Sequence, residues 1–220
     1  MVHLGWLSLS NALTAIEAAA VLAFALSGLV AAARKRLDAV GVCVVAGLTA
    51  FGGGTIRDVL LDRRPFFWVE HATWLWVLLT LCILAMTFMR SRHHSPTMRA
   101  MQWPDAVGLG LFTANGTQIA LAAGMPPIVA VLMGMITGVF GGVLRDIVCN
   151  EIPTAFSDHR PYAICAFFGG WSLIGAQAMQ VPDGLALVLA IGVTTGLRAW
   201  AMVVGFTLPQ WDPGADEPKE

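Results

Sequence analysis

The chain has 220 residues, of which 57% are hydrophobic and 12% are charged, and its mean hydropathy is +0.71. Because soluble domains carry about 25% charged residues, this composition excludes an ordinary soluble domain and predicts an all-α polytopic membrane protein. The net charge of −1 does not argue for nucleic acid as a partner. The four cysteines lie in apolar stretches without CxxC or histidine spacing, so we expect no disulfide, metal site or cofactor.

Seven apolar stretches are long enough to cross a bilayer, which takes about 20 residues of helix. They span roughly 10–32, 39–61, 69–90, 103–123, 126–150, 160–179 and 184–206. The first is too long for the core of a signal peptide, so we expect a retained helix. The short connections predict one transmembrane domain over residues 1–208. Residues 209–220 are rich in proline and acidic residues, which predicts a disordered tail.

Lysine and arginine in the short loops predict the orientation, because they accumulate on the cytoplasmic side. The loops after the first, third and fifth stretches carry Arg34, Lys35, Arg36, Arg90, Arg92, Arg99 and Arg160. The loop after the second stretch carries Arg63 and Arg64, and the loops after the fourth and sixth carry neither residue type. This balance predicts an N-terminus outside and a C-terminus in the cytoplasm.

One seven-residue segment occurs twice in nearly the same form. Its copies are Gly52-Gly53-Gly54-Thr55-Ile56-Arg57-Asp58 and Phe140-Gly141-Gly142-Val143-Leu144-Arg145-Asp146. Adding 88 to a residue number in the first half gives its partner in the second, as for Glu17 and Asp105, and for Phe24 and Phe112. Each unit, about 10–90 and 100–179, contains three stretches. Since three is odd, the units enter the membrane from opposite sides, which predicts inverted repeats followed by a seventh helix over 184–206.

The glycines of both copies are candidate pore positions, because glycine weakens a helix by about 1 kcal/mol relative to alanine. With their neighbours, the candidate kink positions are Phe51, Gly52, Gly53, Gly54, Thr55, Phe140, Gly141 and Gly142. A helix broken there would present carbonyl groups as ligands for a cation. Close packing is the alternative, since small residues recur every four positions at Gly134, Gly138 and Gly142. Both interpretations can hold together, and we favour a functional kink.

An arginine and an aspartate follow the glycines in each copy, at depths where an ionisable group is costly unless it faces protein or water. At about 1.5 Å of rise per residue, Arg57 and Arg145 lie about 10 Å to opposite sides of the midplane. Glu17 and Asp105 lie at the depths of Arg57 and Arg145 respectively. We therefore predict two ion pairs, Glu17–Arg57 and Asp105–Arg145, since an unpaired charge would be too costly.

Asp58 and Asp146 are expected to point away from the preceding arginine, because successive helical residues diverge by about 100°. They would then cap a bent segment, bind a neighbouring helix or face a lumen. All these charges can act as internal staples. For Arg57, Asp58, Arg145 and Asp146 we favour a pathway, in which an arginine moved through the membrane field is worth about 2.3 kcal/mol per 100 mV and can gate it.

Two further features lie in the fourth and seventh stretches. Asn115, Thr117 and Gln118 form a polar patch midway along 103–123, expected to face the bundle as pore lining or as interhelical hydrogen bonds. Arg198 lies in 184–206, where it either snorkels towards the interface or joins the charges near Arg145.

The paired glycine and Arg-Asp segments, with Pro65 and Pro153 downstream, resemble the prokaryotic branch of the trimeric intracellular cation (TRIC) channels. Bacterial members are also described as putative glycine transporters. The resemblance covers about residues 10–206. It implies a multi-pass protein of the bacterial inner membrane and a homotrimer with one pore per protomer, lined by the kinked second and fifth helices.

The same resemblance implies conduction of monovalent cations, chiefly potassium, so the expected partners are membrane lipid, permeant cations and further copies of the chain. Lipid regulation is not implied, because the fifth stretch carries only Arg145 as a cation. A secondary transporter for glycine or another small zwitterion is the competing hypothesis. We expect no enzyme, since HExxH, GxSxG and phosphate-loop motifs are missing.

Overall fold

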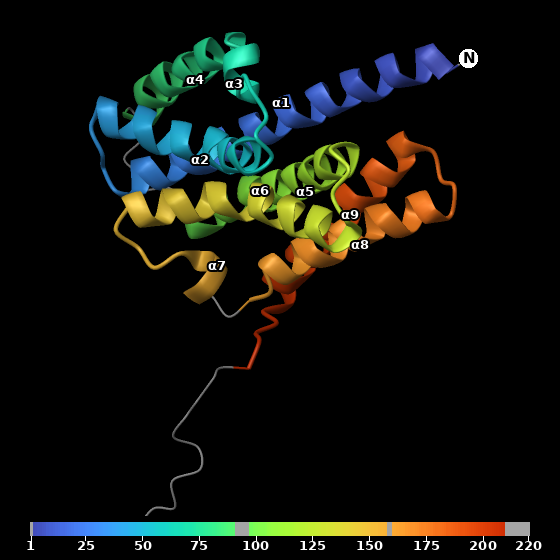
Figure 1. Ribbon diagram of the computed structural model, residues 1–220. Helices are drawn as coiled ribbons and strands as arrows, with labels where there is room; N and C mark the ends of the chain where they lie inside the picture. Colours follow the sequence, from blue (N-terminus) through green and yellow to red (C-terminus); the bar gives the residue numbers. More distant parts are fainter. Residues whose placement is uncertain (1, 91–96, 158–159, 210–220) are drawn as a thin grey trace, which may run out of the picture.

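The computed structural model describes residues 2–90, 97–157 and 160–209, and every regular element in them is a helix. Seven helices are long and two have four residues (Figure 1). Their bounds are α1 Val2–Arg34, α2 Ala39–Leu60, α3 Phe67–Glu70, α4 Thr73–Arg90, α5 Met98–Ala122, α6 Pro127–Val148, α7 Thr154–Ser157, α8 Ala163–Ala178 and α9 Asp183–Val204.

The seven long helices correspond one for one to the predicted stretches. Four of them, α1, α2, α6 and α9, are long and apolar enough to cross a membrane. An all-helical membrane protein is therefore confirmed. The predicted tail lies outside the described residues from residue 210 onward.

The short helices α3 and α7 were not predicted. Each follows an Arg-Asp segment and precedes the third long helix of its unit. The third and sixth long helices consequently begin at Thr73 and Ala163, later than expected. In contrast, α5 begins at Met98, earlier than expected, and carries Pro104 as its seventh residue, where the proline ring removes one helical hydrogen bond.

The two units pack against each other through matching helices. Helix α1 lies against α5 and α2 lies against α6, while α4 and α8 flank this group at the upper left and lower right of Figure 1. Helix α9 packs on α8 and α5, so it covers the second unit. This arrangement leaves the Arg-Asp segments of α2 and α6 buried inside the bundle.

Many contacts occur twice, 88 residues apart. The Thr49 hydroxyl donates to the carbonyl of Val45 at 2.6 Å, and the Thr137 hydroxyl donates to that of Met133 at 2.6 Å. A Cβ built on Gly28 would lie 2.8 Å from the Thr49 hydroxyl, and one on its counterpart Gly116 would lie 2.5 Å from that of Thr137. The repeat found in the sequence thus describes the packing as well.

Candidate functional site

Arg57 is the centre of a buried charge cluster in the first unit, which we call the Arg57 network: Glu17, Arg57, Asp58 and Phe67. The guanidinium lies 2.8 Å from the Glu17 carboxylate and 2.7 Å from that of Asp58. Its Cζ lies 5.3 Å from the centroid of the Phe67 ring. The second oxygen of Asp58 accepts a hydrogen bond from the backbone N–H of Phe67 at 2.9 Å, which holds the first turn of α3.

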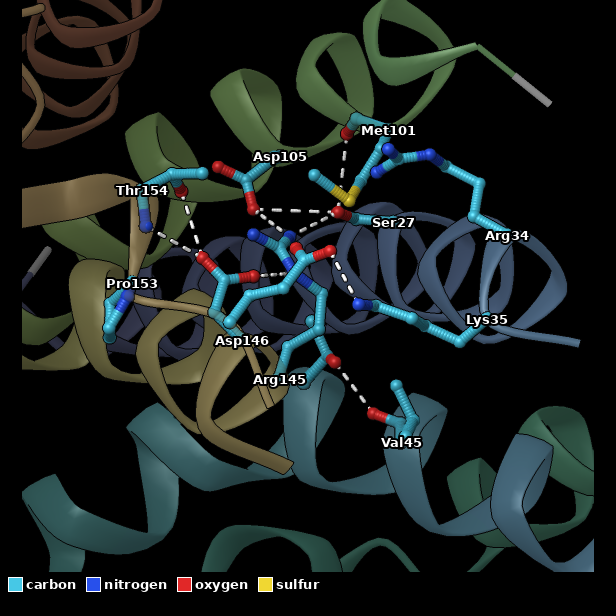
Figure 2. A network of polar contacts seen from close by, with 12 residues as sticks. Ser27, Arg34, Lys35, Val45, Met101, Asp105, Arg145, Asp146, Pro153 and Thr154 are labelled. Carbon is cyan, nitrogen blue, oxygen red and sulfur yellow. Dashed lines mark hydrogen bonds and ion pairs between the residues drawn. The ribbon is translucent and has the colours of Figure 1, made fainter. Parts of the chain in front are cut away.

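Arg145 is the centre of a matching cluster, which we call the Arg145 network: Ser27, Asp105, Arg145, Asp146, Thr154 and Tyr162. Figure 2 labels all of these residues except Tyr162. One guanidinium nitrogen contacts the Asp105 carboxylate and donates to the Ser27 hydroxyl at 2.6 Å. Arg145 Nε donates to Asp146 at 2.8 Å, and Asp146 accepts the backbone N–H of Thr154 at 2.8 Å.

The two predicted ion pairs, Glu17–Arg57 and Asp105–Arg145, are confirmed. The expectation that Asp58 and Asp146 point away from their arginines is wrong, because each is ion-paired with the residue before it. The 100° rule describes the Cα–Cβ directions. An arginine has four rotatable bonds beyond Cα, so its Nε can curve back to a neighbouring carboxylate. Asp58 and Asp146 also hold α3 and α7, as the capping alternative required.

Both networks carry more negative than positive groups. Each contains one arginine and two carboxylates, and all six side chains are no more than 6% exposed. Counted over one arginine and two carboxylates, each cluster has a formal charge of −1. Two further cations lie at the edges: Arg63 is 3.9 Å from Asp58, and Arg198 is beside Tyr162. Arg57 and Arg145 are therefore each more than neutralised by the two carboxylates that they contact.

Arg198 joins the second network through the chain's single tyrosine, Tyr162. Its guanidinium carbon lies 4.8 Å from the centroid of the Tyr162 ring, and it donates to the Pro161 carbonyl at 3.3 Å. The Tyr162 hydroxyl donates in turn to Asp105 at 2.5 Å. Arg198 is 2% exposed, so it does not snorkel.

The glycines mark a close crossing of α2 and α6. A Cβ on Gly53 would lie 2.0 Å from the Thr137 carbonyl oxygen, and one on Gly141 would lie 2.4 Å from that of Thr49. Neither helix is broken there, contrary to the expected interruption, because α2 and α6 continue as α-helix through all five glycines. Close approach between the units, the packing alternative, accounts for Gly53 and Gly141.

The remaining candidates flank the crossing. Gly52, Gly54 and Gly142 face Leu144, Phe67 and the Asp105 carboxylate respectively. The Thr55 hydroxyl donates to the Phe51 carbonyl at 2.7 Å, and the Trp68 indole donates to Thr55 at 3.1 Å. Phe51, Thr55, Gly52 and Leu144 line a cavity of about 350 Å³ beside α2. Phe140 is half-buried.

Sequence reasoning missed Ser27, Thr154 and Tyr162. Ser27 and Tyr162 interrupt apolar stretches, and Tyr162 is the chain's single tyrosine, so composition offered a weak signal for both. The predicted polar patch faces the bundle. Gln118 accepts a hydrogen bond from Gln177 at 2.8 Å, whereas the buried polar atoms of Thr117 and Asn115 have no hydrogen-bond partner within the described residues.

The family model described as "Glycine transporter" matches the chain twice, over residues 14–90 and 102–178. The inner membrane protein YadS of Escherichia coli K12 is 38% identical over 189 residues, covering 84% of this chain and 89% of that protein. A membrane protein of Vibrio cholerae is 36% identical over 186 residues, covering 84% of this chain and 77% of that protein.

Two solved structures have the same fold. The TRIC trimeric intracellular cation channel orthologue from Rhodobacter sphaeroides superposes with a TM-score of 0.81 at 32% identity, covering 88% of this chain and 98% of that one. A second TRIC cation channel gives a TM-score of 0.79 at 31% identity, covering 90% and 96%. These relatives are channels and membrane proteins, and none is an enzyme. The chain therefore belongs to the TRIC channel family, whose bacterial members are described as glycine transporters, and is a non-enzymatic multi-pass protein of the inner membrane.

Proposed function

We propose that the protein is a channel for monovalent cations, mainly potassium, with one pore in each protomer lined by α2 and α6. The support comes from the solved relatives, which are cation channels, and from the placement of both Arg-Asp segments inside the bundle. Potassium is the permeant species rather than a resident cofactor. The residues that carry the role are Arg57, Asp58, Arg145 and Asp146, with Glu17, Asp105 and Arg198 in support.

The observation that carries this proposal is the excess of carboxylates around each arginine. A lone buried arginine would repel a cation, since the interaction of two charges is weakly screened away from bulk water. Two carboxylates against one guanidinium reverse the sign of the local field. A site of this charge attracts cations and disfavours anions.

The conformation described here is, in this proposal, a closed one. The backbones of α2 and α6 touch where Gly53 and Gly141 face the carbonyls of Thr137 and Thr49. An ion passing between these helices needs them to separate or slide. The unbroken helices also mean that cation ligands would come from carboxylates and hydroxyls rather than from free carbonyl groups.

The assembly is proposed to be a homotrimer in lipid, with seven crossings arranged as two inverted three-helix units plus α9. The N-terminus would lie outside and the C-terminus in the cytoplasm. Native mass spectrometry of the detergent-solubilised protein tests the trimer. A reporter fused after the last residue, active only in the cytoplasm, tests the orientation.

Transport of glycine or a similar zwitterion is the second candidate, favoured by the description of the matching family model. In that mechanism the substrate carboxylate would meet an arginine. Arg57 and Arg145 are each faced by two carboxylates already, which disfavours an anionic group as a further partner.

Electrical recordings from planar bilayers that contain the purified protein distinguish a channel from a transporter. A channel gives unitary potassium currents that reverse at the potassium equilibrium potential. Saturable glycine uptake into liposomes without such currents would replace the channel proposal by the transporter.

A further inference from the structure

The two charge networks differ in one contact that joins the units. Arg145, in the second unit, donates to Ser27 in the first unit at 2.6 Å. The contacts of Arg57, by comparison, are with Glu17, Asp58 and Phe67, all from its own unit. Within the described residues, a hydrogen bond between the two units is thus formed by Arg145 and not by Arg57.

Asn115 is the residue expected to form the equivalent contact with Arg57. Ser27 lies 88 positions before Asn115, and Arg57 lies 88 before Arg145. The pseudo-symmetric equivalent of the Ser27–Arg145 bond is therefore an Asn115–Arg57 bond. Asn115 is 0% exposed, and neither its amide oxygen nor its amide nitrogen has a hydrogen-bond partner in the described part of the chain.

An unpartnered buried amide is costly, because it has lost its hydrogen bonds to water without replacement. Small apolar residues occupy the neighbouring buried positions Ala114 and Gly116, so an apolar residue would fit the composition of this helix. The amide oxygen is an acceptor of the kind that a guanidinium donates to. Its place in the 88-residue register and its chemistry match those of a partner for Arg57.

The two networks also differ in how firmly their acids are held. Asp105 accepts the Tyr162 hydroxyl at 2.5 Å as well as contacting Arg145. The counterpart of Tyr162 is Trp74, whose ring packs on Phe67 with centroids 5.8 Å apart. Glu17 has its described contact with Arg57 alone. Arg57 is therefore the arginine with fewer anchors and the freer one to change partner.

We propose that Asn115 is the cross-unit acceptor for Arg57 in a second conformation, in which the Ser27–Arg145 bond is broken. Inverted repeats make such an exchange natural, since each unit can adopt the arrangement now held by the other. In the present structure the hydrogen bond between the units is formed by Arg145 and not by Arg57. In the second conformation it is formed by Arg57 and not by Arg145. The identification of these states as closed and conducting rests on the proposed channel function.

Matched variants test the exchange. Ser27→Ala removes the acceptor used in the present state, and Asn115→Ala removes the one used in the second. A hydrogen bond to a charged group typically changes a two-state ratio by about tenfold or more. Single-channel recordings should show the open probability rising in Ser27→Ala and falling in Asn115→Ala. The double exchange Ser27→Asn with Asn115→Ser should reverse the preference of the natural protein.

A distance measurement keeps the test independent of conduction. Spin labels at the exposed positions Leu22 of α1 and Ile147 of α6, in a cysteine-free background, report the populations by double electron–electron resonance. Ser27→Ala and Asn115→Ala should shift these populations in opposite directions. Equal shifts in one direction, or unchanged distributions in both variants, would show that Asn115 is a structural residue and overturn the exchange. A wild type without potassium currents but with opposite shifts would refute the channel alone.

Discussion

Phe24 stacks on Phe112, the residue 88 positions later, with ring centroids 5.5 Å apart and ring planes 27° apart. A side chain that touches its own counterpart must lie beside the axis that exchanges the two units. Gly53 and Gly141 behave in the same way, because a Cβ on Gly53 would lie 3.4 Å from the Gly141 nitrogen. The axis therefore passes between α1 and α5 and between α2 and α6, and the two arginine networks lie to either side of it.

Adding one methyl group at the crossing should destabilise the protein. Gly53→Ala and Gly141→Ala place a Cβ against a backbone carbonyl, and overpacking of this kind costs about 1–3 kcal/mol. Gly192→Ala in α9 is the matched control, since its Cβ would meet no atom within 4 Å. Thermal unfolding in detergent should show lower midpoints for the first two variants and an unchanged or higher midpoint for the control. Equal midpoints in all three would refute tight packing at the crossing.

The two acids opposite the arginines should differ in their contribution. Asp105→Asn breaks a buried pair, a change that costs about 3–5 kcal/mol, and it also disturbs the hydrogen bond from Tyr162. Glu17→Gln should cost less, because no second donor is lost with it, whereas in both variants the arginine keeps the aspartate that follows it. Chemical denaturation of both variants gives the order. A larger loss of unfolding free energy for Glu17→Gln would contradict this ranking.

Tyr162 has two separable roles. Tyr162→Phe removes the hydrogen bond to Asp105 but keeps the ring beside Arg198, and should cost about 1.5–3 kcal/mol as a bond to a charged group. Tyr162→Leu also removes the cation–π contact, which adds about 0.5–2 kcal/mol. Thermal unfolding midpoints that decrease from the wild type to Tyr162→Phe, and again to Tyr162→Leu, support both roles. Identical midpoints for Tyr162→Phe and the wild type would show that this hydrogen bond does not contribute to stability.

Neutralising one aspartate should weaken cation conduction most at low salt. Asp58→Asn or Asp146→Asn changes the formal charge of its network from −1 to 0. The Debye length is about 30 Å at 0.01 M and about 3 Å at 1 M, so added salt screens the field that this charge projects into the water at the pore entrance, while the buried contacts are screened much less. Unitary potassium conductance should fall several-fold at the lower ionic strength and little at the higher. An equal loss at both would indicate a structural rather than an electrostatic effect.

The predictable part of the site followed from depth and repetition. Arg57 and Glu17 could be paired from sequence because both lie in long apolar helices, where the cost of an unpaired charge leaves few alternatives. The 88-residue register then assigned Asp105 to Arg145 without further information. In contrast, Ser27 and Tyr162 carry no such constraint, since neither is charged and a serine hydroxyl in a helix can bond to its own backbone.

The sequence by itself determined the membrane class, the long helices, the 88-residue repeat and the two acid–arginine pairs, because hydropathy, helix rise and periodicity are properties of the chain. Tertiary structure decided the rest. In the folded protein each arginine is paired with the aspartate that follows it, and α2 and α6 stay helical where the glycines suggested a break. Ser27 accepts a hydrogen bond from Arg145, whereas Asn115 has no hydrogen-bond partner within the described residues. These outcomes depend on which surfaces meet across the pseudo-two-fold axis, and contacts of that kind are absent from any single helix.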